Sequence, residues 1–128
     1  MTETHDASLQ LEISPDPQLL RILRLVASGV ASLGEFDLAA VEEARVAVDE
    51  LGATLIAASS GSPIRLTFEL LDGVLRVEGR TKVDTELEVD PLTDRILDVV
   101  ASRHEWESSG GAARGRVEKD PSAAAVLS

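Results

Sequence analysis

The sequence contains no cysteine and very few aromatic residues, and both absences limit what the chain can do. Without cysteine, it has no disulfide framework and no thiolate for catalysis or metal binding. Aromatic residues make up 2% of the chain, so leucine, valine, isoleucine and alanine must form the core. The two histidines, His5 and His104, are far apart in the sequence and do not have metal-ligand spacing. We therefore expect no metal site.

Basic residues are also scarce. Lysine and arginine together number 12 against 23 acidic residues, which gives a net charge of −11. Contacts to nucleic-acid phosphates need clustered lysine and arginine, so this balance argues against direct nucleic-acid binding. It fits a soluble protein, or one that meets a basic partner.

Long apolar runs are missing as well. None approaches the roughly 18 residues of a membrane span, and the polar, acidic start MTETHDAS does not have the pattern of a signal peptide. We expect a cytoplasmic protein that does not contact a membrane. Its length suits one domain with a real core. We place that domain at residues 8–119, between disordered segments at 1–7 and 120–128.

The stretch from Asp37 to Ser59 is the clearest element in the chain. Asp37 stands where a helix-capping residue belongs, because its carboxylate can accept a hydrogen bond from the first turn. Apolar residues then recur three and four positions apart, which predicts one long amphipathic helix. Gly52 lies inside it, where a missing side chain indicates close packing or a nearby ligand.

The other elements follow from period and turn residues. We expect helices from Asp16 to about Leu33 and from Pro91 to about His104. Alternation predicts strands at 8–14, 64–71, 74–80, 105–108 and 112–119, and Asp72-Gly73 predicts a tight hairpin turn. This order indicates an α+β fold, with about three helices on one face of a mixed, mostly antiparallel sheet. The residues expected to be mostly buried are Leu20, Leu23, Val26, Val30, Val41, Ala44, Val48, Leu51, Leu55, Leu66, Phe68, Leu75, Val77, Leu92, Ile96, Val99 and Val100.

Candidate chemistry is concentrated at one place. The chain has no G-x-S-x-G, no Walker A motif and no Rossmann glycine pattern. On the central helix, Glu50 follows Asp49 and precedes Thr54 by one turn. Glu50 can serve as a general base if it faces a pocket; otherwise it is a surface carboxylate on an acidic helix.

The segment ARVAVDELGATLIAAS, residues 44–59, resembles the N box of the GHKL (Bergerat-fold) ATP-binding superfamily. The branch it resembles most is the bacterial anti-sigma factor and serine kinase family. There a glutamate is followed four residues later by an asparagine that carries Mg²⁺ to the phosphates; Glu50 and Thr54 stand at these positions. The order of elements also matches over about Ser8 to Lys119. The resemblance implies a GHKL-like two-layer fold.

The chain departs from that family at its nucleotide site. Thr54 has a shorter reach than asparagine. The Asp-x-Gly-x-Gly box, expected after the strand ending at Val77, reads Glu78-Gly79-Arg80-Thr81-Lys82. The Gly-x-Gly run that opens the third helix reads Asp90-Pro91-Leu92-Thr93, where proline lacks an amide hydrogen and aspartate repels phosphate. We therefore expect Glu50 as a vestigial base, Thr54, Gly79 and Gly111 as vestigial nucleotide-binding residues, and no cofactor.

The resemblance also implies partners. Members of that family hold a sigma factor away from RNA polymerase, are released by a STAS-type antagonist, and commonly dimerise. We expect a degenerate anti-sigma regulator, acting in a stress or sporulation response, that binds a sigma factor without ATP. The expected partner-binding residues are Arg21, Arg24 and Glu35, on or next to the first helix. Two alternatives are an active serine kinase or ATPase that uses Mg-ATP, and a non-enzymatic interaction domain for another signalling partner.

Overall fold

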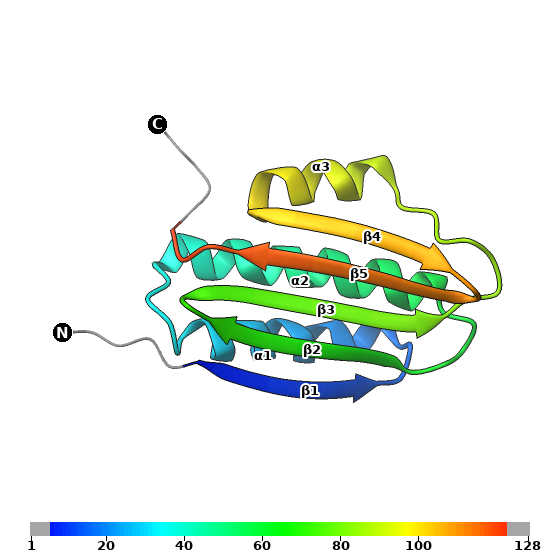
Figure 1. The fold of residues 1–128 in the computed structure, drawn as a ribbon, viewed down its shortest axis with the longest axis horizontal. Helices are drawn as coiled ribbons and strands as arrows, with labels where there is room; N and C mark the ends of the chain where they lie inside the picture. The colour runs from blue at the N-terminus through cyan, green and yellow to red at the C-terminus, as the bar shows by residue number, and fades with distance from the viewer. Residues whose placement is uncertain (1–5, 123–128) are drawn as a thin grey trace.

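The computed structural model describes residues 6–122 and has two layers (Figure 1). Its elements in chain order are β1 (Ala7–Ile13), a 3-10 turn (Pro17–Leu19), α1 (Leu20–Ala31), α2 (Leu38–Ala58), β2 (Ile64–Leu71), β3 (Val74–Lys82), α3 (Pro91–Val100), β4 (Arg103–Ser109) and β5 (Ala112–Lys119).

The strands form one sheet in the order β1-β2-β3-β5-β4, and the three helices lie along one of its faces (Figure 1). Every pairing among these described strands is antiparallel. Two hairpins set this topology, because Asp72-Gly73 and Gly110-Gly111 adopt the positive φ that tight turns require. The expected α+β class is confirmed, with a sheet that is antiparallel rather than mixed. None of the helices within residues 6–122 is long and apolar enough to cross a membrane.

Aspartate caps fix where the helices begin. The Oδ1 atom of Asp37 accepts a hydrogen bond of 2.7 Å from the Ala40 amide, as the sequence predicts, and Asp90 accepts one of 2.8 Å from the Leu92 amide. The expected ends of the domain move slightly. Ala7 already belongs to β1, and Asp120 is held by Ser102 and Arg103. Residues 1–5 and 123–128 of the expected disordered segments lie outside the described part.

Most of the expected core residues are buried between the layers. Leu23, Leu51, Leu55, Phe68 and Val77 have relative exposures of 0%. Val30, Ala44, Val48, Leu66 and Leu75 are also buried, whereas Leu20, Val26 and Val41 are half-buried at the edge of the core. One continuous aliphatic cluster therefore joins the helices to the sheet.

The prediction of which face of the third helix is buried is wrong. Leu97 is fully buried, while Leu92 and Val99 are 56% and 65% exposed; Ile96 and Val100 are half-buried. The helix also ends at Val100, so His104 belongs to β4 instead. Aliphatic residues occur on both sides of this short helix, and packing against α2 selects the side that carries Leu97.

Two glycines let the layers approach closely. A Cβ atom at Gly52 would lie 2.8 Å from Leu20 and Leu23, so α1 packs directly against α2 there. A Cβ atom at Gly115 would lie 2.6 Å from Leu51 of α2 and from the Trp106 ring. The sequence around Gly115 is a poor strand sequence by propensity. Because Gly115 fits closely beneath α2, this segment nevertheless forms β5, the second strand from the edge of the sheet.

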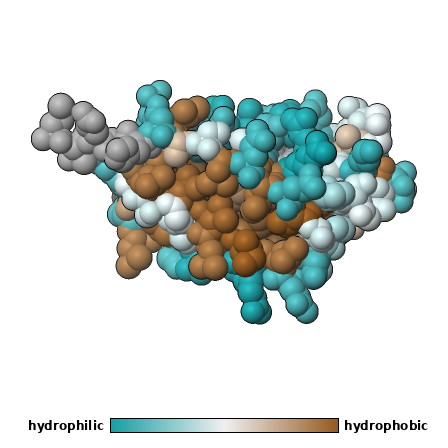
Figure 2. All heavy atoms as spheres, turned by 90° about the horizontal axis from the view of Figure 1, so that it is seen from below, coloured by the Kyte–Doolittle hydropathy of each residue, from teal (hydrophilic) through white to brown (hydrophobic). Residues whose placement is uncertain are grey.

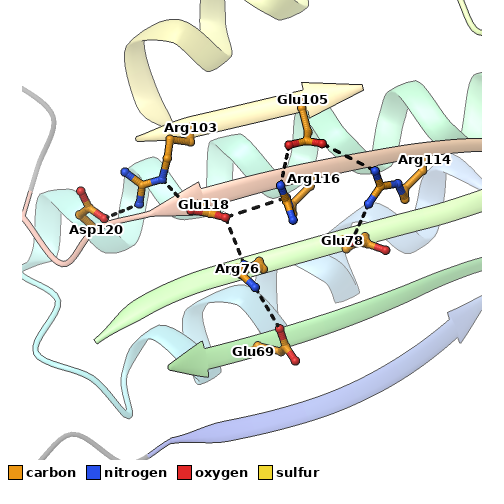
Figure 3. A network of polar contacts seen from close by, with 9 residues as sticks. All are labelled: Glu69, Arg76, Glu78, Arg103, Glu105, Arg114, Arg116, Glu118 and Asp120. Atoms are coloured by element: carbon orange, nitrogen blue, oxygen red, sulfur yellow. Dashed lines mark hydrogen bonds and ion pairs between the residues drawn. The ribbon is translucent and has the colours of Figure 1, made fainter. Parts of the chain in front are cut away.

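The outer face of the sheet, which no helix covers, carries alternating charges (Figure 3). Glu118 lies at the centre of the network, 2.6 Å from Arg103 Nε and 3.1 Å from Arg76 Nε. Arg114 binds Glu78 at 3.2 Å across neighbouring strands. The face is close to neutral, since seven basic residues alternate with six glutamates: Arg65, Arg76, Arg80, Lys82, Arg103, Arg114 and Arg116 against Glu12, Glu69, Glu78, Glu105, Glu107 and Glu118. The net charge of −11 therefore lies elsewhere on the chain.

This network predicts a loss of stability in acid. The hydrogen bond from Arg103 lowers the pKa of Glu118 below its ordinary value, and nearby Arg76 and Arg116 add to the effect. A lowered pKa stabilises the fold above the ordinary glutamate pKa of about 4.3, and that contribution is lost as pH falls through the folded value. Urea unfolding between pH 7 and pH 3 is expected to show a shallower acid loss in Glu118→Gln than in the wild type. An equal loss of unfolding free energy between pH 7 and pH 3 in the two proteins would contradict this. Glu35→Gln, which lies outside the network, serves as control.

Candidate functional site

A pocket of about 490 Å³ lies between α2 and the segment that leads into α3. We call it the α2–α3 pocket. Small side chains line it on the α2 side, and acidic side chains line the other side. The lining residues are Ala53, Thr54, Ala57, Ala58, Thr85, Glu86, Glu88, Asp90 and Thr93. Another hollow, of about 530 Å³, lies on the outer face over β1, β2 and β3, and contains none of the expected site residues. The α2–α3 pocket is therefore the candidate site.

Glu50 and Thr54 come together beside this pocket. Thr54 lines it, and half-buried Glu50 lies one turn earlier on α2. The Thr93 hydroxyl donates a 3.1 Å hydrogen bond to Glu50 Oε1, which ties α2 to the first turn of α3. Sequence reasoning missed Thr93, because only the packing of α3 on α2 brings it to Glu50. In this arrangement Glu50 acts as a link between two helices.

The acidic side of the pocket disfavours anions. Asp90 already accepts the Leu92 amide at the start of α3, and Pro91 at the first helical position has no amide hydrogen. Helix N-termini normally bind phosphate through their free amides. Here a phosphate would meet the carboxylates of Asp90, Glu86 and Glu88 instead. Among the described residues there is also no cluster of histidine and carboxylate side chains suited to hold a metal ion.

The two glycines expected as vestigial nucleotide-binding residues lie in different places. Gly79 lies in the middle of β3 beneath α2, where an added Cβ would lie 2.6 Å from Leu55 Cδ1. It does not line the pocket. Gly111 lies in the β4–β5 turn, with φ of 77°, and its carbonyl accepts a 2.9 Å hydrogen bond from the Val83 amide. It lines an adjoining hollow that shares Thr85 and Glu86 with the pocket.

The end of β3 changes how the sequence compares with the Asp-x-Gly-x-Gly pattern. The strand pairs with β5 as far as Lys82, and Val83 bridges Ser59. The segment after the strand is therefore Asp84-Thr85-Glu86-Leu87-Glu88, which has aspartate in the first position and glutamate at both glycine positions. The strand was expected to end at residue 80 and runs to Lys82. The alternation of buried residues continues through Thr81 and Val83, and this signal would have placed the strand end correctly.

Of the expected partner-binding residues, two are free at the surface. Arg21 and Glu35 are exposed. Arg24 was expected on the exposed face of the first helix; its side chain is 37% exposed, and its guanidinium pairs with Asp49 of α2. Its long side chain lies on the flank of α1 nearest to α2 and reaches across. Arg24 therefore joins α1 to α2.

Comparison with known proteins supports the fold. A scan against protein-family models finds no match, and a search of curated proteins finds none either. Among solved structures, the chain is similar to the crystal structure of the RsbU and RsbW domains of Rv1364c from Mycobacterium tuberculosis, with a TM-score of 0.69 and 12% sequence identity. The match covers 91% of this chain and 34% of that chain, so this chain spans about a third of it. At this identity the likeness shows a shared α+β fold and no shared activity or partner.

Proposed function

We propose that this chain is an anti-sigma factor-like regulator that sequesters a sigma factor by protein–protein binding and does not use ATP. The observation that carries the proposal is the α2–α3 pocket. It lies between α2 and the segment that leads into α3, where members of the family that the sequence resembles bind phosphates, yet Asp90, Glu86 and Glu88 line it. Because this pocket repels anions, we place the function of the domain in protein binding at its surface.

The distribution of charge supports a basic partner. The outer face of the sheet is nearly neutral, so the excess of acidic residues lies elsewhere on the chain, and much of it is in the segment before and within α3. Residues 84–98 alone hold six carboxylates against Arg95. Sigma factors bind DNA and carry basic surfaces, and opposite net charges speed association. In this proposal a STAS-type antagonist releases the complex.

The absence of useful Mg-ATP binding is the first consequence. A ligand at 100 times its dissociation constant stabilises a protein by about 2.7 kcal/mol, which thermal melting detects readily. We expect millimolar Mg-ATP to leave the melting temperature unchanged. We also expect Thr54→Asn alone not to create binding, since Asp90, Glu86 and Glu88 would remain in the pocket.

Glu50→Ala is the control for this experiment. It removes the hydrogen bond from Thr93, so its own stability can change, and the comparison is the shift that Mg-ATP adds to each protein. A clear shift in the wild type that Glu50→Ala abolishes would favour the alternative of an active serine kinase. Failure to find either ATP or a sigma factor, with another protein bound stoichiometrically, would favour the interaction-domain alternative.

A further inference from the structure

Charged side chains on the outer face of the sheet lie in rows that run across the strands. Opposite charges in directly facing positions stabilise a sheet, whereas like charges in such positions destabilise it. Two of the rows follow this rule, because their charges alternate in sign from strand to strand. These rows are Glu69–Arg76–Glu118–Arg103 and Glu78–Arg116–Glu105.

A third row breaks the alternation. Arg80 of β3 lies directly opposite Arg65 of β2 on one side and Arg114 of β5 on the other. We call these three residues the arginine row. Lys82, two positions further along β3, is exposed on the same face and makes no ion pair with any residue from 6 to 122. Three arginines in facing positions act against the stability of the sheet, and departures of this kind from a local rule are expected at functional sites.

The three arginines differ in how fully they are paired. The Arg114 side chain is 30% exposed and contacts three carboxylates within 3.6 Å. The Arg65 side chain is 75% exposed, and its partner among the described residues is Glu12, at 3.1 Å. The Arg80 side chain is 62% exposed and pairs with Glu78 at 2.9 Å. A guanidinium has five N–H donors, so Arg65 and Arg80 keep most of theirs for a ligand.

These two arginines line the hollow of about 530 Å³ on the outer face. Gln10 and Thr67 line it as well, and they offer an amide and a hydroxyl for hydrogen bonding. The volume lies within the range of small-molecule sites. The hollow therefore combines two open guanidinium groups with neutral polar side chains.

The two guanidinium groups point toward different carboxylates. Nε of Arg65 donates to Glu12 of β1, whereas Nη2 of Arg80 donates to Glu78 of its own strand. This arrangement suits two separate anionic groups better than a single anionic centre. A planar carboxylate matches the planar guanidinium fork. A small molecule with two carboxylates would use both arginines at once.

Exposed apolar side chains gather away from this row. Figure 2 views the molecule from the side of β1 and α1, and brown side chains lie across the middle of that face. Ile22 and Leu25 of α1 are 41% and 65% exposed. On the outer face, exposed Leu71 lies six positions from Arg65 along β2, about 20 Å away. Protein interfaces are built around buried aromatic or apolar anchors, so the surroundings of the arginine row favour a small polar ligand over a protein.

We propose that Arg65 and Arg80 form a binding site for a small dicarboxylate in this hollow. Each guanidinium donates to one carboxylate of the ligand, and its own glutamate partner holds it in place. Gln10 and Thr67 hydrogen-bond to the ligand, and Lys82 adds positive charge nearby. The bound carboxylates relieve the repulsion between the facing arginines. The net charge of −11 repels anions at long range, so binding depends on these local donors.

NMR titration of the full chain with acetate, succinate, glutarate or adipate, at constant pH and ionic strength, tests the site. Saturable shifts are expected at the Nε–H groups of Arg65 and Arg80. At least one dicarboxylate is expected to bind about tenfold more tightly than acetate, because its second carboxylate adds a charge-assisted hydrogen bond. Inorganic phosphate, a single anionic centre, is expected to bind more weakly than that dicarboxylate.

Arg80→Gln is expected to weaken dicarboxylate binding about tenfold. Arg76→Gln is the matched control, because Arg76 lies on the same strand and face but in an alternating row, and it is expected to change the affinity by less than about twofold. Without ligand, Arg80→Gln is expected to melt no lower than Arg76→Gln, since it relieves like-charge contacts and the control removes favourable ones. Circular dichroism checks that both variants are folded.

Four results would overturn the proposal. They are shifts that do not saturate, no dicarboxylate that binds more tightly than acetate and phosphate, equal loss of binding in Arg76→Gln and Arg80→Gln, and a lower melting temperature for Arg80→Gln than for Arg76→Gln. The site lies on the opposite face of the sheet from the helices and the α2–α3 pocket, so these results do not depend on sigma-factor binding.

Discussion

Lys119→Ala is expected to lower the free energy of unfolding by about 3–5 kcal/mol, because it removes a buried cation that pairs with half-buried Glu43. Lys119 has a relative exposure of 2%, and its Nζ atom lies 2.6 Å from Glu43 Oε1 of α2. The alanine variant leaves the Glu43 carboxylate near the core without this cation. For a domain of this size the loss corresponds to a drop in melting temperature of roughly 10–20 °C.

A double replacement measures the net contribution of the ion pair to stability, without the cost of leaving one charge without its partner. Lys119→Met together with Glu43→Leu replaces both charges with apolar groups, which is often neutral or stabilising at buried pairs. Arg45→Ala, which removes an exposed pair with Glu42 at 3.0 Å, is expected to cost less than about 1 kcal/mol. Urea unfolding measures all three variants. If Lys119→Ala proved as stable as Arg45→Ala, the proposed contribution of the Lys119–Glu43 ion pair to stability would be contradicted.

Leu51→Ala is expected to cost about 2–5 kcal/mol, the range for a well-packed core leucine. Leu51 has a relative exposure of 0%, and its Cδ1 atom lies over Gly115 of β5. Truncation would leave a cavity between α2 and the sheet, since the surrounding strands are held by their hydrogen-bond ladders.

Leu38→Ala is the control for this measurement. Leu38 opens the same helix but is 80% exposed, so its replacement is expected to change stability by no more than about 0.5 kcal/mol. Chemical denaturation of both variants, with the slope checked for two-state behaviour, gives the comparison. Equal costs for Leu38→Ala and Leu51→Ala would contradict the placement of α2 against the sheet.

Local signals in the sequence predicted most of the fold. The long central helix follows from the Asp37 cap and the 3.6-residue period, and the β2–β3 hairpin follows from Asp72-Gly73. The inner face of α3 could not be predicted in the same way, because aliphatic residues lie on both sides of that helix. Packing on α2 selects Leu97, and no pattern within α3 records this choice.

The candidate site was predicted only in part. Glu50 and Thr54 are four residues apart on one helix, so sequence spacing alone brings them together. Thr93 reaches Glu50 only through the packing of α3 on α2. The role of Arg24 was missed for the same reason, since Asp49 is 25 residues away along the chain. The arginine row is a property of strand register, which no single strand shows.

Capture of partners from the source cell tests the central claim most directly, if it is done with and without Mg-ATP. The account predicts that the chain recovers a sigma factor in both conditions, and that Arg21→Glu weakens the complex more than Arg65→Glu on the outer face of the sheet. The amount of sigma factor recovered is also expected to fall as salt rises. Salt screens the attraction between the opposite net charges, which at physiological ionic strength already acts over only about 8 Å. Repeated recovery of no sigma factor, or recovery only with Mg-ATP, would contradict the account.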